Sequence, residues 1–163
     1  MINLLPYHRE TLVSSYSGVE VKRYLSESTA EINYLDRRTQ SKKKGILFNG
    51  LIGKKGFRIS KVIDKGDTFL PLILGKIEET PRGCIIFLQY RLFPGAVFFL
   101  AFWTLLLLFF SAYFIFGAKN YLNGSICFSL TLVNYLVSMF FFHRQVQSSR
   151  KTFFTLINFQ MKD

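Results

Sequence analysis

Acidic residues, cysteine and proline are all scarce in this sequence, and these shortages limit the classes of protein to which the chain can belong. The chain of 163 residues contains 10 Asp and Glu residues, 2 cysteines and 4 prolines. Cys84 and Cys127 are far apart and belong to no spaced motif, so we expect no disulfide framework and a reducing, cytoplasmic setting for the soluble part. The opening "MINLLPYHRE" lacks the basic start and apolar core of a secretory signal, so we expect none.

The few titratable side chains form no pattern typical of catalysis or metal binding. His8 and His143 are isolated from each other and from the cysteines, whereas zinc needs about four ligands in a recognisable spacing. Glu78 and Glu79 are adjacent at the end of a predicted strand, so their carboxylates point to opposite faces. We therefore expect no catalytic residue, no metal and no cofactor, and we do not expect an enzyme.

Charge is absent from two long stretches in the second half of the chain. Residues 95–117 and 121–142 contain no charged side chain, and Lys119 lies between them. As a helix, the first stretch is about 34 Å long, slightly more than the ~30 Å hydrocarbon core of a bilayer. The first stretch is apolar on every side, and a chain this small has too little protein to bury two such helices. The sequence predicts a transmembrane helical hairpin.

Basic residues around this hairpin predict its orientation. Arg82 and Arg91 precede the first span, Arg144 and Arg150 follow the second, and Lys119 is the only cation between the spans. Cytoplasmic flanks carry the excess of lysine and arginine. We therefore expect both termini in the cytoplasm and a short turn on the far side of the membrane.

The second span carries small and polar residues at helical spacing. These residues let helices approach closely and form hydrogen bonds within lipid. The spacing fits packing against the first span, an interface with a second copy or a membrane-protein partner, and a pore lining, although a pore needs a more polar face. The candidate helix–helix interface consists of Ser125, Ser129, Asn134 and Ser138.

The soluble part combines helical and two-residue periodicities. A helix is expected from Gly18 to about Thr29. After Gly45, apolar and polar residues alternate between Gly and Pro turns, which predicts an antiparallel meander in which Pro71 moves its strand to an edge or a bulge. Residues 143–163 are apolar on one side; this helix fits both a cover for the sheet, which we favour, and a place on the bilayer interface.

These observations predict a membrane α+β protein: a two-helix transmembrane hairpin joined to a small antiparallel β-sheet of about four strands, with flanking N- and C-terminal helices. In chain order, the predicted parts are an N-terminal helix and basic linker (1–44), a cytoplasmic antiparallel sheet (45–94), the hairpin (95–142, with helices 95–117 and 121–142) and a C-terminal amphipathic basic helix (143–163).

Positive charge dominates the chain, with 21 Lys and Arg residues and a net charge of +11. Beside a cytoplasmic membrane surface, each basic residue of a linker gains about 1 kcal/mol from anionic lipid. Plain solvation is the alternative interpretation. Nucleic acid is not expected, because the aromatic residues that would stack on bases are mostly in the hairpin. The candidate lipid-surface residues are Arg37, Arg38, Lys42, Lys43, Lys44, Lys54, Lys55 and Arg58.

The sheet region also carries a pattern of aromatic, glycine and proline residues that ends in "RLFP" before the first span. It consists of Phe48, Gly50, Phe57, Ile59, "TFLP" ending at Pro71, Gly75, Ile77 and Gly83. This pattern resembles that of a group of uncharacterised bacterial two-pass membrane proteins, over about half of the chain. The resemblance implies a bacterial inner-membrane protein with a cytoplasmic sheet domain, and it implies no activity.

Two functions remain as hypotheses. The first is a non-catalytic accessory or scaffold module that binds a partner at the cytoplasmic face of the membrane. The second is a sensor or effector, in which a ligand changes the association of the transmembrane helices. Membrane lipids are expected partners in either case, together with a second copy of the chain or another membrane protein.

Overall fold

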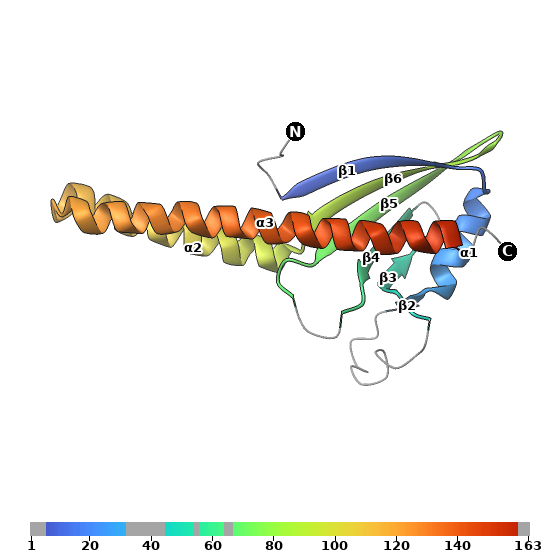
Figure 1. Cartoon of the computed structure of the whole chain (residues 1–163), viewed down its shortest axis with the longest axis horizontal. Helices are drawn as coiled ribbons and strands as arrows, with labels where there is room; N and C mark the ends of the chain where they lie inside the picture. The colour runs from blue at the N-terminus through green and yellow to red at the C-terminus, as the bar shows by residue number, and fades with distance from the viewer. Residues whose placement is uncertain (1–5, 32–44, 54–55, 64–66, 160–163) are drawn as a thin grey trace.

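The computed structural model describes residues 6–31, 45–53, 56–63 and 67–159. The molecule is elongated, with a helical hairpin at one end and a sheet domain at the other (Figure 1). The elements in chain order are β1 (Tyr7–Ser14), α1 (Gly18–Glu27), β2 (Thr29–Glu31), β3 (Phe48–Ile52), β4 (Gly56–Lys61), β5 (Pro71–Thr80), β6 (Gly83–Leu92), α2 (Pro94–Ala112), the π-helix η2 (Tyr113–Gly117) and α3 (Tyr121–Phe159).

The described residues form one sheet of six strands in the order β1-β6-β5-β4-β3-β2. The predicted antiparallel meander is confirmed as β3 to β6, but the predicted number of about four strands is too low. The two additional strands are the edges: β1 pairs antiparallel with β6, and β2 pairs parallel with β3. Both come from the first part of the chain, where only a helix and a linker were expected.

Strand β5 lies in the interior of the sheet and pairs with β6 in unbroken register, so the prediction that Pro71 moves its strand to an edge or a bulge is wrong. Strand β5 is hydrogen-bonded to both β4 and β6, and Pro71 is its first residue. A proline is tolerated there because the first position of a strand need not donate to the ladder. The tight turn that follows β5 uses Gly83, whose φ of 134° favours glycine.

Helix α1 forms as predicted from residue 18 and is stabilised by a capping box. The Ser17 hydroxyl accepts from the Glu20 backbone N–H, and the Glu20 carboxylate accepts from the Ser17 backbone N–H. That bond from the Ser17 backbone lowers the pKa of Glu20. On the opposite side of the helix, Val21 and Leu25 are buried against the sheet.

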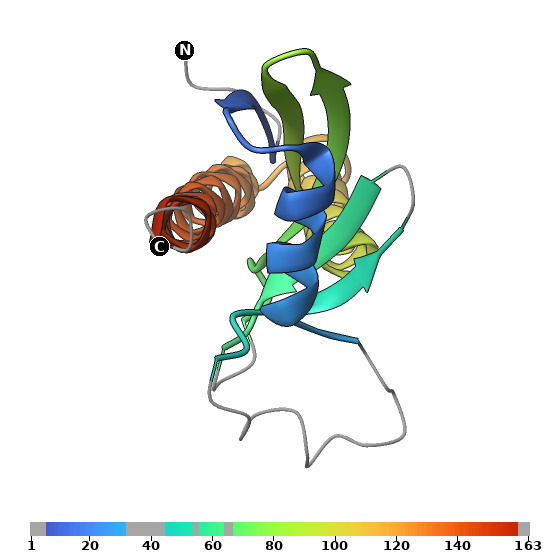
Figure 2. The same ribbon diagram turned by 90° about the vertical axis from the view of Figure 1, so that its right-hand side faces the viewer.

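Helix α3 is one continuous helix of 39 residues, about 58 Å long. The sequence predicted a span ending at Phe142 and a separate helix from residue 143, and the structure joins the two. Its second half covers the sheet, as favoured above, with Val146, Phe153 and Leu156 in the hydrophobic core. Figure 2 looks along the molecule and shows α1 and α3 on the same side of the curved sheet.

Within the described residues, two helical segments are long and apolar enough to cross a membrane, Pro94–Gly117 and Tyr121–Ile157. The hairpin parts of these segments are not core helices of a soluble domain, because their large apolar side chains are exposed; Phe98 is 77% exposed and Leu136 is 64% exposed. These exposed side chains lie along both helices of the hairpin, which also pack against each other.

The two hairpin helices are in close contact at Gly124. A Cβ added to Gly124 would lie 2.4 Å from Ile115 Cγ1, so a larger residue here would require the Ile115 side chain to shift. Ser111 Oγ donates to the Gly124 carbonyl at 3.0 Å. Lys119, in the turn between the helices, has a φ of 51°. This conformation is uncommon for a side chain other than glycine and reverses the chain in three residues.

Candidate functional site

The sheet has one covered face and one open face, and alternate residues of each strand belong to each. On β6, Cys84, Ile86, Leu88 and Tyr90 point to the covered face, which α1 and α3 occupy. The same face requires a glycine at position 75, because a Cβ there would lie 2.0 Å from the ring of Phe57. That ring stacks on the ring of Phe153 in α3, and the two ring centres are 5.8 Å apart. Core packing therefore joins α3 firmly to the covered face.

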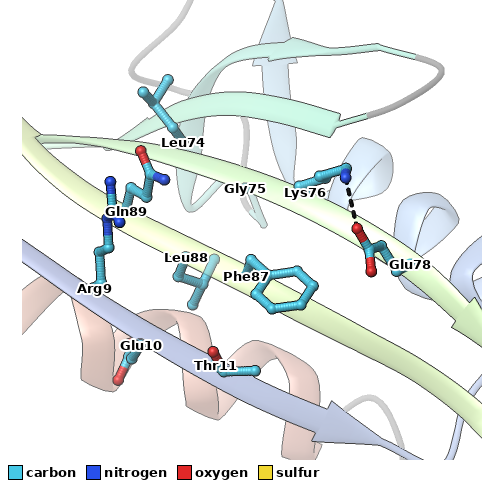
Figure 3. Close-up of a pocket in the computed structure, with 10 residues that line it drawn as sticks. All are labelled: Arg9, Glu10, Thr11, Leu74, Gly75, Lys76, Glu78, Phe87, Leu88 and Gln89. Carbon is cyan, nitrogen blue, oxygen red and sulfur yellow. Dashed lines mark hydrogen bonds and ion pairs between the residues drawn. The ribbon is translucent and has the colours of Figure 1, made fainter.

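The open face contains a shallow hollow of about 490 Å³ that spans β1, β6 and β5. Across the strands, the register aligns Arg9 with Gln89, Gln89 with Leu74, and Leu74 with Arg58. In Figure 3, Arg9 and Gln89 lie together on one side of the hollow, and Phe87 lies toward Lys76 and Glu78. The lining residues are Arg9, Glu10, Thr11, Leu74, Gly75, Lys76, Glu78, Phe87, Leu88 and Gln89.

Two guanidinium groups gather at the end of the open face nearest the hairpin. Arg9 lies 4.8 Å and Arg91 5.3 Å from the centre of the Tyr7 ring. Arg91 also donates to the amide oxygen of Gln89 at 3.0 Å. The aromatic ring and the amide hold both cations in place without neutralising either of them.

Positive charge is therefore in excess on the open face. Lys76 is paired with Glu78 at 2.6 Å, and both side chains are exposed. Arg9, Arg58 and Arg91 form no ion pair with a carboxylate within the described part of the chain. Between these cations, Leu74 and Phe87 supply apolar surface. The arrangement is suited to a partner that presents carboxylates beside an apolar side chain.

On the covered face, a buried carboxylate connects β1, β6 and α3. Tyr90 Oη donates to Glu10 Oε1 at 2.6 Å, and Arg150 Nε lies 2.6 Å from Glu10 Oε2. Tyr90 is fully buried. Burial and then the adjacent Glu10 carboxylate raise the pKa of the Tyr90 hydroxyl, which stays protonated and remains a donor. The network fixes the position of the β1 edge relative to α3.

Three further contacts bind α3 to the sheet near the hairpin. Lys61 of β4 donates to Ser148 Oγ at 2.8 Å. Gln145 Nε2 donates to Asp67 Oδ2. Phe69, which precedes β5, stacks on Phe141 at 5.7 Å. The sheet and the hairpin are thus connected through α3 as well as through the short link from β6 to α2.

Of the predicted lipid-surface residues, the structure describes Arg58. It is exposed on β4 and points to the open face, opposite Leu51 and Leu74 in the register. Nothing in the sequence around Arg58 distinguished it from the other basic residues. The remaining seven residues lie outside the described ranges: Arg37, Arg38, Lys42, Lys43, Lys44, Lys54 and Lys55.

The predicted helix–helix residues fall on two different sides of α3. Ser138 is buried and Asn134 is half-buried, and both line a groove between α2 and α3 of the same chain. Ser125 and Ser129 are exposed on the outside of the hairpin. The tight contact at Gly124 was not anticipated, although a glycine within an apolar helix is a known signal of close helix packing.

The described residues contain no group of three or more His, Cys, Asp or Glu side chains that would hold a metal ion. The chain matches no protein-family model, and no curated protein or solved structure is similar to it. The resemblance to bacterial two-pass membrane proteins therefore stays a prediction. Any functional conclusion rests on the open face, the hairpin and their connection through α3.

Proposed function

We propose that the protein is a non-catalytic integral membrane module of the bacterial inner membrane that binds a protein partner through the open face of its cytoplasmic sheet. The carrying observation is the hollow on that face, which Arg9 lines, together with Arg58 and Arg91 elsewhere on the face; within the described residues none of the three forms an ion pair with a carboxylate. The partner is an acidic segment of another protein that also places an apolar side chain against Phe87.

The membrane assignment is supported by the exposure of the hairpin. Transferring a fully buried Phe or Leu side chain out of water is worth about 1.5–3 kcal/mol, and more than a dozen large apolar side chains of the hairpin are exposed. In a bilayer, these side chains would contact the acyl chains of the lipids. The excess of basic residues at the sheet end supports a cytoplasmic position for that end and for both termini.

The non-catalytic assignment is supported by the surroundings of the carboxylates. Glu78 is paired with Lys76, and Glu10 is occupied by Tyr90 and Arg150. Both carboxylates are thus already engaged in interactions within the chain. Recognition by charge and shape is what remains for this surface.

A crosslinking experiment in living cells tests the binding face. A photoreactive amino acid at Phe87 is expected to trap one protein, and the charge reversals Arg9→Glu and Arg58→Glu should reduce that product at least fivefold. Arg23→Glu, on the exposed side of α1, is the matched control and should leave it unchanged. Equal products from all variants would exclude the open face as the binding surface.

The second candidate function, a sensor or effector, is favoured by the continuity of α3. The helix carries Phe142 at the base of the hairpin and Phe153 in the sheet core without a break. A change in the packing of α3 against α2 would therefore move side chains of the sheet core directly. The two candidate functions differ in one respect. In a sensor, a change in the packing of the hairpin helices would alter the open face, whereas in a binding module it would not.

A further inference from the structure

A groove between α2 and α3 begins at the sheet end of the hairpin and reaches toward its middle. Its volume is about 370 Å³. The α2 wall includes Leu100, Ala101 and Leu105, and the α3 wall includes Asn134, Tyr135 and Met139. The groove is thus almost entirely apolar and has its principal polar group at its deep end.

That polar group is the side-chain amide of Asn134. Its Nδ2 is buried and has no hydrogen-bond partner within the described structure. The two neighbouring hydroxyl groups have no proton left to donate to a ligand, because each donates to a carbonyl of its own helix. Thr104 donates to the Leu100 carbonyl at 2.8 Å, and Ser138 donates to the Asn134 carbonyl at 2.7 Å. A buried N–H without an acceptor is costly, most of all in hydrocarbon.

The depth of Asn134 limits what supplies the missing acceptor. Asn134 lies eight residues from Phe142, or about 12 Å along the helix from the end of the apolar stretch. Phospholipid carbonyls lie at the edge of the hydrocarbon core, about 15 Å from its centre, and do not reach this position. The acceptor belongs to a molecule whose polar group enters the bilayer interior.

We propose that the groove binds a lipid-soluble quinone, whose ring carbonyl accepts a hydrogen bond from Asn134 Nδ2 once the side-chain amide turns toward the groove. A quinone ring offers acceptors and no donors, which matches a site whose unused group is a donor. Its flat ring fits beside Tyr135, and its apolar tail follows the wall formed by Leu100 and Ala101. The inference rests on the proposed membrane hairpin and does not depend on the cytoplasmic partner.

Binding is measured with the full chain in phosphatidylcholine nanodiscs by quenching of Trp103, the single tryptophan, next to the groove residue Thr104. The probe is a short-tailed benzoquinone, compared with the same tail on a benzene ring. Wild type should show saturable quenching by the quinone alone. Asn134→Leu should weaken binding about three- to fifteenfold, the range expected for one hydrogen bond in a membrane.

Two further variants separate loss of the amide from general disturbance. Ala101→Phe fills the groove without changing the amide and should also weaken binding. Ser129→Leu, an exposed polar-to-apolar change on the same helix, should bind like wild type. Equal quenching in wild type and Asn134→Leu, or equal binding of the benzene analogue, would overturn the quinone site.

Other occupants and the membrane assignment are distinguished in the same preparation. Two chains per disc, joined by a disulfide between Asn134→Cys copies, would show that a second copy fills the groove and would overturn the proposal. Alkaline extraction of native membranes reports insertion separately. A chain released by alkali would overturn the hairpin assignment and this site together, whereas an inserted chain without quenching overturns the quinone site alone.

Discussion

At the scale of single residues, the core depends on a glycine that makes room for an aromatic ring. Gly75 lies opposite Phe57, and a Cβ there would overlap the ring that stacks on Phe153. Gly75→Ala is expected to destabilise the protein by about 1–3 kcal/mol, the usual cost of overpacking. Gly95→Ala is the control, because nothing lies within 4 Å of the added atom. Thermal unfolding in detergent micelles compares the two, and equal midpoints would contradict the packing.

The Glu10 carboxylate gives a second residue-scale prediction. Glu10→Ala leaves the Tyr90 hydroxyl buried without an acceptor, which costs about 1–3 kcal/mol. Glu78→Ala removes an exposed carboxylate paired with Lys76 and should cost less than about 1 kcal/mol. The same unfolding measurement ranks the variants. A smaller loss for Glu10→Ala than for Glu78→Ala would show that the buried network does not contribute to stability.

The Cys84 thiol provides a pH-dependent test of the core. Burial, followed by the nearby Glu79 carboxylate, raises the pKa of the thiol. Because the folded pKa is raised, the protonated form is favoured, its contribution to stability is lost as pH rises, and little reactive thiolate exists near pH 8. Maleimide should therefore label Cys84 at pH 8 only after unfolding. A cysteine introduced by Thr11→Cys on the open face should react in the folded protein.

At the scale of elements, the continuity of α3 is the feature that joins hairpin and sheet. Gln147 is exposed in this helix, and Gln147→Pro should break it locally, whereas Gln147→Ala should not. Spin labels at Lys119 and Arg82, in a background with Cys84→Ser and Cys127→Ser, report the distance between hairpin turn and sheet tip. We expect one narrow distance distribution for Gln147→Ala and a broad one for Gln147→Pro; two equally narrow distributions would contradict a rigid α3.

Elements with regular local patterns were predictable from the sequence, and those made by distant contacts were not. Strand β4 alternates between apolar and polar residues, and Gly and Pro turn residues mark the ends of strands β3 to β6. Strand β1 does not alternate in this way, because its covered side carries His8, Glu10 and Ser14, whose polarity is satisfied only after β6 and α3 are in place. Strand β2 has three residues and exists through parallel pairing with β3. The change in composition at His143 indicated a boundary, but the helical backbone continues through it.

The candidate site was predictable to a smaller extent. The basic composition indicated an anionic partner, but only the register shows that Arg9, Arg58 and Arg91 share one face. Asn134 was expected to face another helix, and it lines a groove with α2 of its own chain. The groove could not be derived from spacing, because it depends on how the side chains of α2 and α3 pack against each other.

At the scale of the whole molecule, the proposed orientation has a direct test. Reporter fusions at residues 1 and 163 should be active only with a cytoplasmic reporter, and a fusion at Lys119 only with a periplasmic one, because basic residues cluster at the sheet end. Periplasmic activity at either terminus would contradict the assignment. Equal activity of both reporters at Lys119 would show that the chain inserts in two orientations.

The position of β1 at the edge of the sheet has a consequence for association between copies. Exposed edge strands tend to pair with their own kind, and two identical strands pair antiparallel about a two-fold axis perpendicular to them. Strand β1 runs broadly along the length of the molecule, as does α3 (Figure 1). Such an axis would point the two hairpins in opposite directions, and two chains inserted alike in one bilayer cannot adopt that arrangement. Membrane insertion would thus forbid self-pairing of β1 while leaving this edge open to a strand of a different protein.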